Sequence, residues 1–177
     1  MQVLTFDLDG VLCHPPFGIN PGRGRNKRRD TPGTRGLLWR TERWRYYGRG
    51  PMPGAREGLV QLARQFECKV LSARGEISRG HPESWLRKQF GFVPEVHLRP
   101  DWHETPAAFK VRKTAELGAV AHFEDDPHTA AWVAESLEAV FLVDWWRNRW
   151  LDAPKVHRIR RIPDALATLA DLGLTGG

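Results

Sequence analysis

Short apolar runs alternate with segments of helical periodicity along the chain, and this alternation constrains its fold more than any other feature. The apolar runs predict five buried strands, at residues 3–7, 69–72, 95–98, 120–124 and 139–143. Helical spacing of apolar residues predicts helices between and after them, at residues 54–66, 82–90, 107–117, 128–137 and 163–172. Strands that alternate with helices form crossover units. We therefore expect an α/β fold with a five-stranded parallel sheet between helices, in a three-layer α/β/α arrangement.

One segment interrupts the alternation, between the first predicted strand and the first predicted helix. Residues 13–50 hold ten of the 27 basic residues and only two acidic ones, so the segment carries a charge of +8 and the rest of the chain −2. Residues 37–39 are its one short candidate for a strand or helix. We expect a single domain over residues 1–177 with a small basic insert, rich in Gly, Pro and Arg, after the first strand.

Aromatic residues lie among the arginines of this insert: Phe17, Trp39, Trp44, Tyr46 and Tyr47. Rings stack on bases while arginines neutralise phosphates, so the segment predicts contact with a nucleotide or nucleic acid. The alternative is a solvated loop whose rings pack back on the domain.

Composition excludes several classes of protein. The two cysteines, Cys13 and Cys68, are too few for a disulfide scaffold or a four-cysteine zinc site and fit a reducing cytosol. No apolar run approaches the roughly 20 residues of a membrane span. The first residues lack the basic start of a signal peptide. We therefore expect a cytoplasmic protein without a membrane span.

Acidic residues directly follow the first predicted strand, in the run from Asp7 to Val11. Ligands bind at the carboxyl ends of the strands in parallel sheets. Two carboxylates there can serve one phosphoryl centre, Asp7 as nucleophile and Asp9 as general acid and base, and both can face one Mg²⁺ ion. The alternative is an ordinary acidic loop.

Three further groups have the same double interpretation. Ser72 ends the second predicted strand, where its hydroxyl can hold a phosphate oxygen or simply cap the next turn. Lys110 lies near a helix start and can neutralise a phosphoryl transition state, or lie on the surface. The acids of residues 124–126 repel one another beside an apolar strand, which favours a divalent ion, although acids also favour helix starts.

In their order, these four groups resemble the motifs of the haloacid dehalogenase superfamily of phosphatases. The family's D-x-D-G-[TV] motif is similar to residues 7–11, its strand ending in Ser or Thr to residues 70–72, its lysine to Lys110, and its paired acids to residues 122–126. The resemblance covers residues 1–12 and 51–145. It leaves residues 13–50 as an insertion at the family's first cap position.

The resemblance implies a Rossmann-like fold and a Mg²⁺-dependent phosphomonoesterase that works through a phospho-aspartyl intermediate. Asp7 would be the nucleophile and a metal ligand, Asp9 the general acid and base with its backbone carbonyl on the metal, and Lys110 a bridge between the phosphoryl group and Asp7. Ser72 would hold a phosphoryl oxygen.

Asp125 would be the remaining metal ligand, assisted by either Glu124 or Asp126. The histidines His122 and His128 are expected to be structural, because carboxylates already supply the oxygen ligands that Mg²⁺ prefers.

A narrower resemblance concerns the 3′-phosphatase domain of polynucleotide kinase-phosphatases. Residues 72–76, 85–86 and 97–99 are similar to stretches of that domain, and they imply that Ser72, Ala73 and Arg74 bind the substrate phosphate. The chain departs from the pattern at Pro106, where that family has an aspartate, and it lacks a P-loop.

Three interpretations of function follow. The first is a phosphatase of nucleotides or nucleic-acid 3′-phosphate ends, the second a phosphatase of small metabolites, and the third a nucleic-acid-binding module on the same scaffold. A second aromatic and basic cluster, at residues 145–150, lines the mouth of the site or anchors the C-terminal segment.

Overall fold

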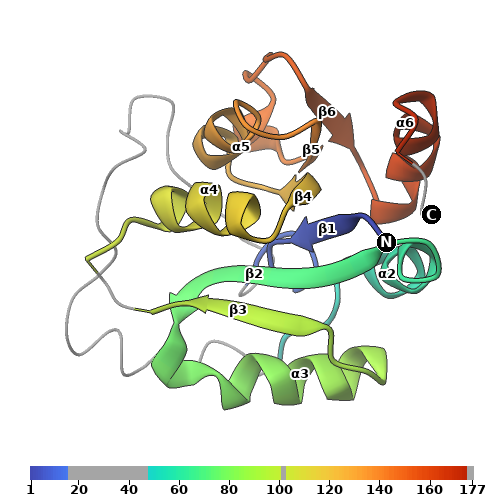
Figure 1. Ribbon diagram of the computed structural model, residues 1–177. Helices are drawn as coiled ribbons and strands as arrows, with labels where there is room; N and C mark the ends of the chain where they lie inside the picture. Colours follow the sequence, from blue (N-terminus) through green and yellow to red (C-terminus); the bar gives the residue numbers. More distant parts are fainter. Residues whose placement is uncertain (16–47, 101–102, 175–177) are drawn as a thin grey trace.

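A single parallel sheet organises the described part of the chain, residues 1–15, 48–100 and 103–174 of this computed structural model (Figure 1). Its strand order is β3-β2-β1-β4-β5-β6. The strands are β1 (Val3–Phe6), β2 (Glu67–Gly75), β3 (Glu95–Arg99), β4 (Ala119–Glu124), β5 (Ala139–Val143) and β6 (Val156–Ile159). The helices are α2 (Ala55–Leu62), α3 (Gly80–Phe90), α4 (Pro106–Glu116), α5 (Pro127–Val133) and α6 (Ala165–Asp171). Short 3₁₀ turns are η3 (Glu76–Ser78), η4 (Trp146–Asn148) and η5 (Ile162–Asp164).

The predicted α/β fold with a parallel sheet is confirmed, but the sheet has six strands instead of five. The missed strand, β6, lies at the edge and spans four residues, with His157 and Arg158 between its two apolar ends. So short and polar a run carries no strand pattern of its own, and it is held by its pairing with β5. Among the described residues, no helix has the length and hydropathy needed to cross a membrane.

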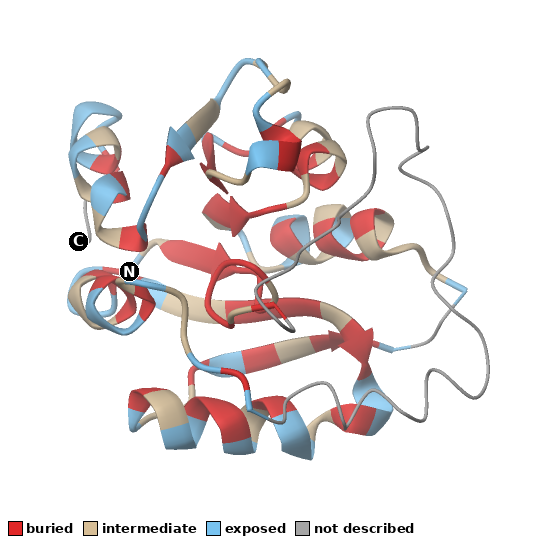
Figure 2. Cartoon of the chain, turned by 180° about the vertical axis from the view of Figure 1, so that it is seen from behind, coloured by how far each residue is buried: buried red, intermediate tan, exposed pale blue. Residues whose placement is uncertain are grey.

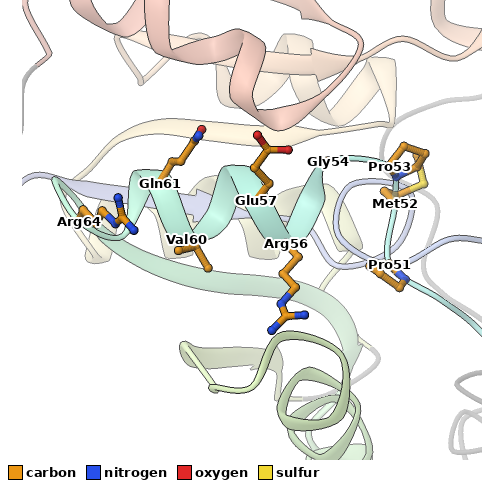
Figure 3. Close-up of a pocket in the computed structure, with 9 residues that line it drawn as sticks. All are labelled: Pro51, Met52, Pro53, Gly54, Arg56, Glu57, Val60, Gln61 and Arg64. Carbon is orange, nitrogen blue, oxygen red and sulfur yellow. The ribbon is translucent and has the colours of Figure 1, made fainter.

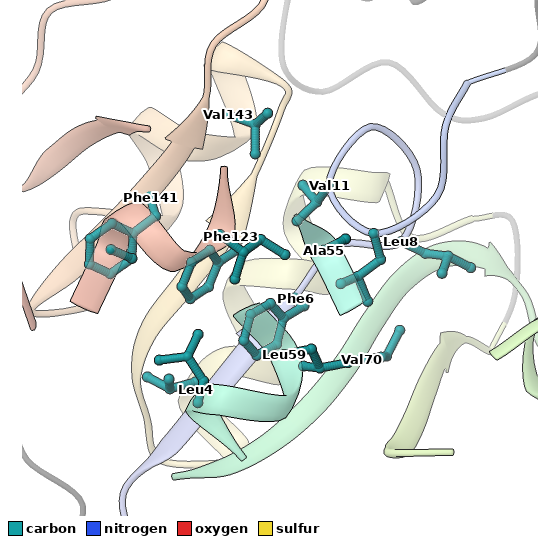
Figure 4. Close-up of a cluster of buried hydrophobic side chains, with 14 of the residues drawn as sticks. Leu4, Phe6, Leu8, Val11, Ala55, Leu59, Val70, Phe123, Phe141 and Val143 are labelled. Atoms are coloured by element: carbon teal, nitrogen blue, oxygen red, sulfur yellow. The ribbon is translucent and has the colours of Figure 1, made fainter. Parts of the chain in front are cut away.

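Alternate residues of the strands pack on opposite faces of the sheet, which produces the three layers. On one face Phe6, Phe123 and Phe141 stack across three strands, with ring centroids 4.4 and 4.8 Å apart (Figure 4). Residues of α2, α3 and α6 complete this core. On the other face Val140 and Leu142 pack against α5. Buried residues accordingly alternate with exposed ones along the helices in Figure 2.

The strand order reverses at β1, which has β2 on one side and β4 on the other. The chain after β1 and the chain after β4 therefore leave the sheet side by side, and the Asp7 N–H donates to the Phe123 carbonyl at 2.9 Å. Such a switch point is where open parallel sheets bind ligands.

The two ends of the predicted insert meet beside this point. The His14 N–H donates to the Gly50 carbonyl at 2.9 Å, and the Met52 N–H donates to the Leu12 carbonyl at 2.8 Å. The Trp85 indole N–H from α3 donates to the Arg49 carbonyl at 2.8 Å and fixes the returning end. Residues 16–47 lie outside the described residues, including 37–39 and all five aromatic residues named above, so the predictions made for them stay predictions.

Candidate active site

Three carboxylates meet where the sheet reverses its strand order. Asp7 follows β1, Glu124 ends β4, and Asp125 comes directly after it. One oxygen of each lies within 4.8 Å of one oxygen of the others, and all three residues are buried. Buried carboxylates at this separation repel one another unless cations lie between them.

Lys110 supplies one such cation from the second turn of α4. Its Nζ lies 3.0 Å from Asp7 Oδ1 and 2.7 Å from Glu124 Oε2, and the side chain is buried. The helix places it there because Thr105 caps the N-terminus, accepting from the Ala108 N–H, and Pro106 begins the first turn. The lysine is therefore not the surface residue of the alternative interpretation.

Glu124 accepts hydrogen bonds at both carboxylate oxygens. Oε1 accepts the backbone N–H groups of Asp125 and Asp126, each at 3.0 Å. Oε2 accepts from Lys110 and lies 3.2 Å from His122 Nε2. Glu124 thus fixes the turn that carries Asp125.

Asp126 has a different place from its two acidic neighbours. Its Oδ1 accepts the Thr129 N–H at 2.9 Å, which makes it the N-cap of α5. Of the two residues expected to assist Asp125, the structure thus brings Glu124 into the cluster.

His122 lies in the same buried network. Its Nδ1 is 2.8 Å from the hydroxyl of Thr5 on β1. If Nε2 carries the proton donated to Glu124, Nδ1 accepts from that hydroxyl, so a neutral ring satisfies both contacts. Burial lowers the pKa of His122 below its usual value, which fits the neutral form. His122 was expected to be structural, and no motif in the sequence indicates its contact with the acid cluster.

Asp9 points its carboxylate at two arginines. Arg74 reaches it with two nitrogens, Nε to Oδ2 and Nη2 to Oδ1, both at 2.7 Å. Arg49 Nη2 lies 2.5 Å from Oδ1. Burial alone would raise the pKa of Asp9, but the two guanidinium groups hold it well below its usual range. In the sequence, Arg49 is one of the ten basic residues of the insert, and no motif marks it as a partner of Asp9.

Ser72 is not the last residue of its strand, contrary to the sequence prediction. β2 continues to Gly75, and its pairing with β3 shifts register between Ser72 and Gly75. Residues 73 and 74 are the extra residues of this irregularity, since Gly75 pairs with Arg99 while Ser72 pairs with Leu98. Such irregularities re-aim side chains, and here Arg74 meets Asp9. Ser72 is buried, and its Oγ accepts the Arg74 N–H at 3.4 Å.

The segment after β5 contacts both acid-bearing loops. The Trp145 indole N–H donates to the Gly10 carbonyl at 3.2 Å. Arg147 Nη2 donates to Asp125 Oδ2 at 2.6 Å, and Asn148 Nδ2 donates to the Asp125 carbonyl at 3.1 Å. The expected aromatic and basic cluster is therefore divided: these residues face the site, whereas Trp146 is 74% exposed.

Burial and mutual repulsion set the protonation of the carboxylates. Burial raises the pKa of Asp7 to about 7, against the opposing charge of Lys110. Burial, with the charges of Glu124 and Asp7, raises the pKa of Asp125 well above its usual value. Burial would also raise the pKa of Glu124, but Lys110 and His122 hold it well below its usual range.

The donor chemistry of this cluster fits Mg²⁺. It offers carboxylate oxygens, the ligands that hard divalent ions take. The three buried acids would also be relieved of repulsion by a divalent charge. The chemistry and the charge of these three carboxylates therefore both fit Mg²⁺.

A separate cavity of about 730 Å³ lies along α2 (Figure 3). Its lining residues are Pro51, Met52, Pro53, Gly54, Arg56, Glu57, Val60, Gln61 and Arg64. None of the acids described above lines it, so the chemistry of the acid cluster does not extend into this cavity.

No family model and no curated protein match this chain. Solved structures do. A haloacid dehalogenase-like hydrolase from Streptococcus pneumoniae superposes with a TM-score of 0.64 over 96% of this chain and 98% of that one, at 10% identity. The chain has the haloacid dehalogenase-like fold.

Two other structures with this fold were solved with phosphate. CbbY from Rhodobacter sphaeroides has a TM-score of 0.62 at 14% identity, covering 96% of this chain and 99% of that one. The D,D-heptose 1,7-bisphosphate phosphatase of B. bronchiseptica, in complex with magnesium and phosphate, has a TM-score of 0.57 at 10% identity, covering 97% and 99%. At these identities the comparison establishes the fold.

Proposed function

We propose that the chain is a Mg²⁺-dependent phosphomonoesterase of the haloacid dehalogenase type, with Asp7 as nucleophile. The observation that carries this proposal is the contact of Lys110 with both Asp7 and Glu124, beside Asp125, at the switch point of the sheet. A carboxylate, a buried lysine and an oxygen-only acid cluster together supply a nucleophile, a positive charge for the phosphoryl group and a metal site.

In the first step an Asp7 oxygen bonds to phosphorus and the bond to the ester oxygen breaks. The leaving oxygen takes a proton from Asp9. In the second step water attacks the phospho-aspartate, gives a proton to Asp9 and releases phosphate and the Asp7 carboxylate. Lys110 balances the charge of the phosphoryl oxygens throughout. Mg²⁺, held by Asp7, Asp125 and the Asp9 carbonyl, would supply further charge stabilisation.

The arginines on Asp9 bear on the first of these steps. Arg74 and Arg49 hold Asp9 as a carboxylate, the form that accepts a proton from water. Donation to the leaving oxygen requires a protonated Asp9, so the guanidinium groups must release it when substrate binds. Arg74 can then turn to the substrate phosphate, together with Ser72 and the Ala73 N–H, as the sequence analysis expected.

The test is phosphate release with and without Mg²⁺. The panel contains nucleotides, phosphosugars and oligonucleotides with 3′- or 5′-phosphate ends. We expect Mg²⁺-dependent release that is lost in Asp7→Asn and kept in the matched variant Asp171→Asn, which changes an exposed acid of α6. Absence of release from every substrate, or equal release by Asp7→Asn, would contradict the proposal.

The same panel identifies the substrate class. Release from oligonucleotide ends would assign the basic segment of residues 13–50 to substrate binding, and it should weaken with salt. Release from small esters alone would make that segment a cap over the site. Salt-dependent nucleic-acid binding without release would support the binding-module interpretation instead.

A further inference from the structure

Arg147 is a buried arginine with an incomplete set of partners. Its side chain is 4% exposed, and Nη2 lies 2.6 Å from Asp125 Oδ2. Its Nε and Nη1 atoms are buried and form no hydrogen bond within the described part of the chain. Buried, unmatched donors cost stability, so hydrogen bonding alone does not account for a guanidinium group at this place.

The negative charges around Arg147 account for the presence of its guanidinium group. Asp7, Glu124 and Asp125 lie together and buried. Lys110 contacts the first two, and Arg147 contacts the third. Each carboxylate of the cluster therefore faces one of two buried cations.

The backbone of Asp125 has anchors other than Arg147. The Asp125 carbonyl accepts from Asn148 Nδ2 at 3.1 Å, and the Asp125 N–H donates to Glu124 Oε1 at 3.0 Å. Arg147 instead contacts the carboxylate, where its positive charge faces the negative charge of Asp125. A divalent ion that binds the Asp125 carboxylate is repelled by the positive charge of Arg147, which already contacts this carboxylate.

We propose that Arg147 is the internal counter-ion of Asp125 in the metal-free protein, and that it weakens Mg²⁺ binding because both cations compete for this carboxylate. The inference rests on the proposed function in taking Asp125 as a metal ligand. It adds a residue that sets the metal affinity and stabilises the site before metal arrives. Stabilisation of the metal-free site and weaker Mg²⁺ binding are linked. Mg²⁺ must displace Arg147 from Asp125, so the free energy that this contact contributes is subtracted from the free energy of metal binding.

The test is titration of the metal-free chain with MgCl₂ in a calorimeter, without substrate. For Arg147→Gln we expect an Mg²⁺ dissociation constant lower by about tenfold, within the usual range of coupling between sites. Its metal-free form should melt at a lower temperature, and Mg²⁺ should raise its melting temperature more than that of the wild type. Arg149→Gln is the matched control, since Arg149 is exposed and pairs with Asp144.

The outcomes separate charge from other causes. Arg147→Lys keeps the charge and should leave the dissociation constant within about threefold of the wild type. An unchanged or weaker Mg²⁺ affinity in Arg147→Gln would overturn the proposal, as would an equal tightening in Arg149→Gln. If metal-free Arg147→Gln does not fold, its refolding on addition of Mg²⁺ becomes the readout, and failure to refold at any concentration overturns the proposal.

Asp125→Asn distinguishes this inference from the proposed function. If Asp125→Asn loses Mg²⁺ binding while Arg147→Gln binds Mg²⁺ as the wild type does, only the role of Arg147 is refuted. Mg²⁺ binding that survives in Asp125→Asn, or is missing in the wild type, refutes the metal site and the inference with it.

Discussion

Substitution of Glu124 by Gln tests the acid network independently of any metal. The side chain keeps its volume, but one carboxylate oxygen becomes an NH₂ group. Because both oxygens accept from two donors each, the NH₂ group faces two donors whichever way the amide is turned. If the NH₂ group faces Lys110 and His122, the hydrogen bond from the buried ammonium is lost. If it faces the turn, the N–H groups of Asp125 and Asp126 lose their acceptor. In either orientation the negative charge beside Lys110 is removed.

The expected loss follows from these contacts. Hydrogen bonds to charged groups contribute about 1.5–3 kcal/mol each, and breaking a buried ion pair costs about 3–5 kcal/mol. Removing the Glu124 charge also relieves repulsion within the cluster. This gain is small at pH 6.5, below the pKa of about 7 of Asp7. We expect the free energy of unfolding to fall by about 3 kcal/mol or more, a large part of the 5–15 kcal/mol of a typical domain.

The assay is urea unfolding followed by circular dichroism at pH 6.5 with a chelator. Glu116→Gln is the matched control, because Glu116 forms one contact each with Arg112 and Lys113 on the exposed face of α4, and such exposed pairs contribute little to stability. If the two variants differ in stability by less than about 1 kcal/mol, the network does not stabilise the site as argued.

Two further predictions concern stability. Burial raises the pKa of Asp7 from 3.8 to about 7, so its contribution is complete below about pH 4 and is lost as the pH rises through about 7. In chelator, the unfolding free energy of the wild type should fall relative to that of Asp7→Asn between about pH 4 and 7, and an equal pH dependence of the two proteins would refute this. Gly58→Ala places a Cβ 2.6 Å from the Ile162 Cγ2 atom and 2.8 Å from the Pro163 Cδ atom; overpacking of about 1–3 kcal/mol should outweigh the helix gain of about 1 kcal/mol. Gly80→Ala meets nothing within 4 Å and should be neutral or stabilising, so equal melting temperatures for the two variants would contradict the argument.

The parts of the fold and site that follow regular sequence patterns could be predicted. Apolar periodicity gave five of the strands and the order of the layers, and the positions of Asp7, Lys110 and Asp125 at strand and helix ends brought them to one place. Residues in irregular segments could not be placed in the same way. Arg49 and Arg147 follow no period. The cluster at residues 145–150 was one candidate for the mouth of the site, but nothing in the chain indicated that Arg49 would reach Asp9 or that Arg147 would reach Asp125.

Three other differences come from long-range contacts. β6 is a strand because β5 pairs with it. Ser72 lies inside its strand because β2 continues past the register shift and pairs with β3 again at Gly75. His122 looked like an ordinary core residue, since its partners Thr5 and Glu124 meet only in the folded sheet.

The contacts of residues 145–148 bear on the order in which the protein matures during synthesis. Asp7 leaves the ribosome first, but Gly10 and Asp125 gain their contacts with Trp145, Arg147 and Asn148 only after β5 has emerged. Domains fold as units as the chain is made. A nascent chain that ends before residue 145 therefore carries every acid of the site but not the segment that ties their loops together. It should remain inactive until nearly the whole sheet has formed.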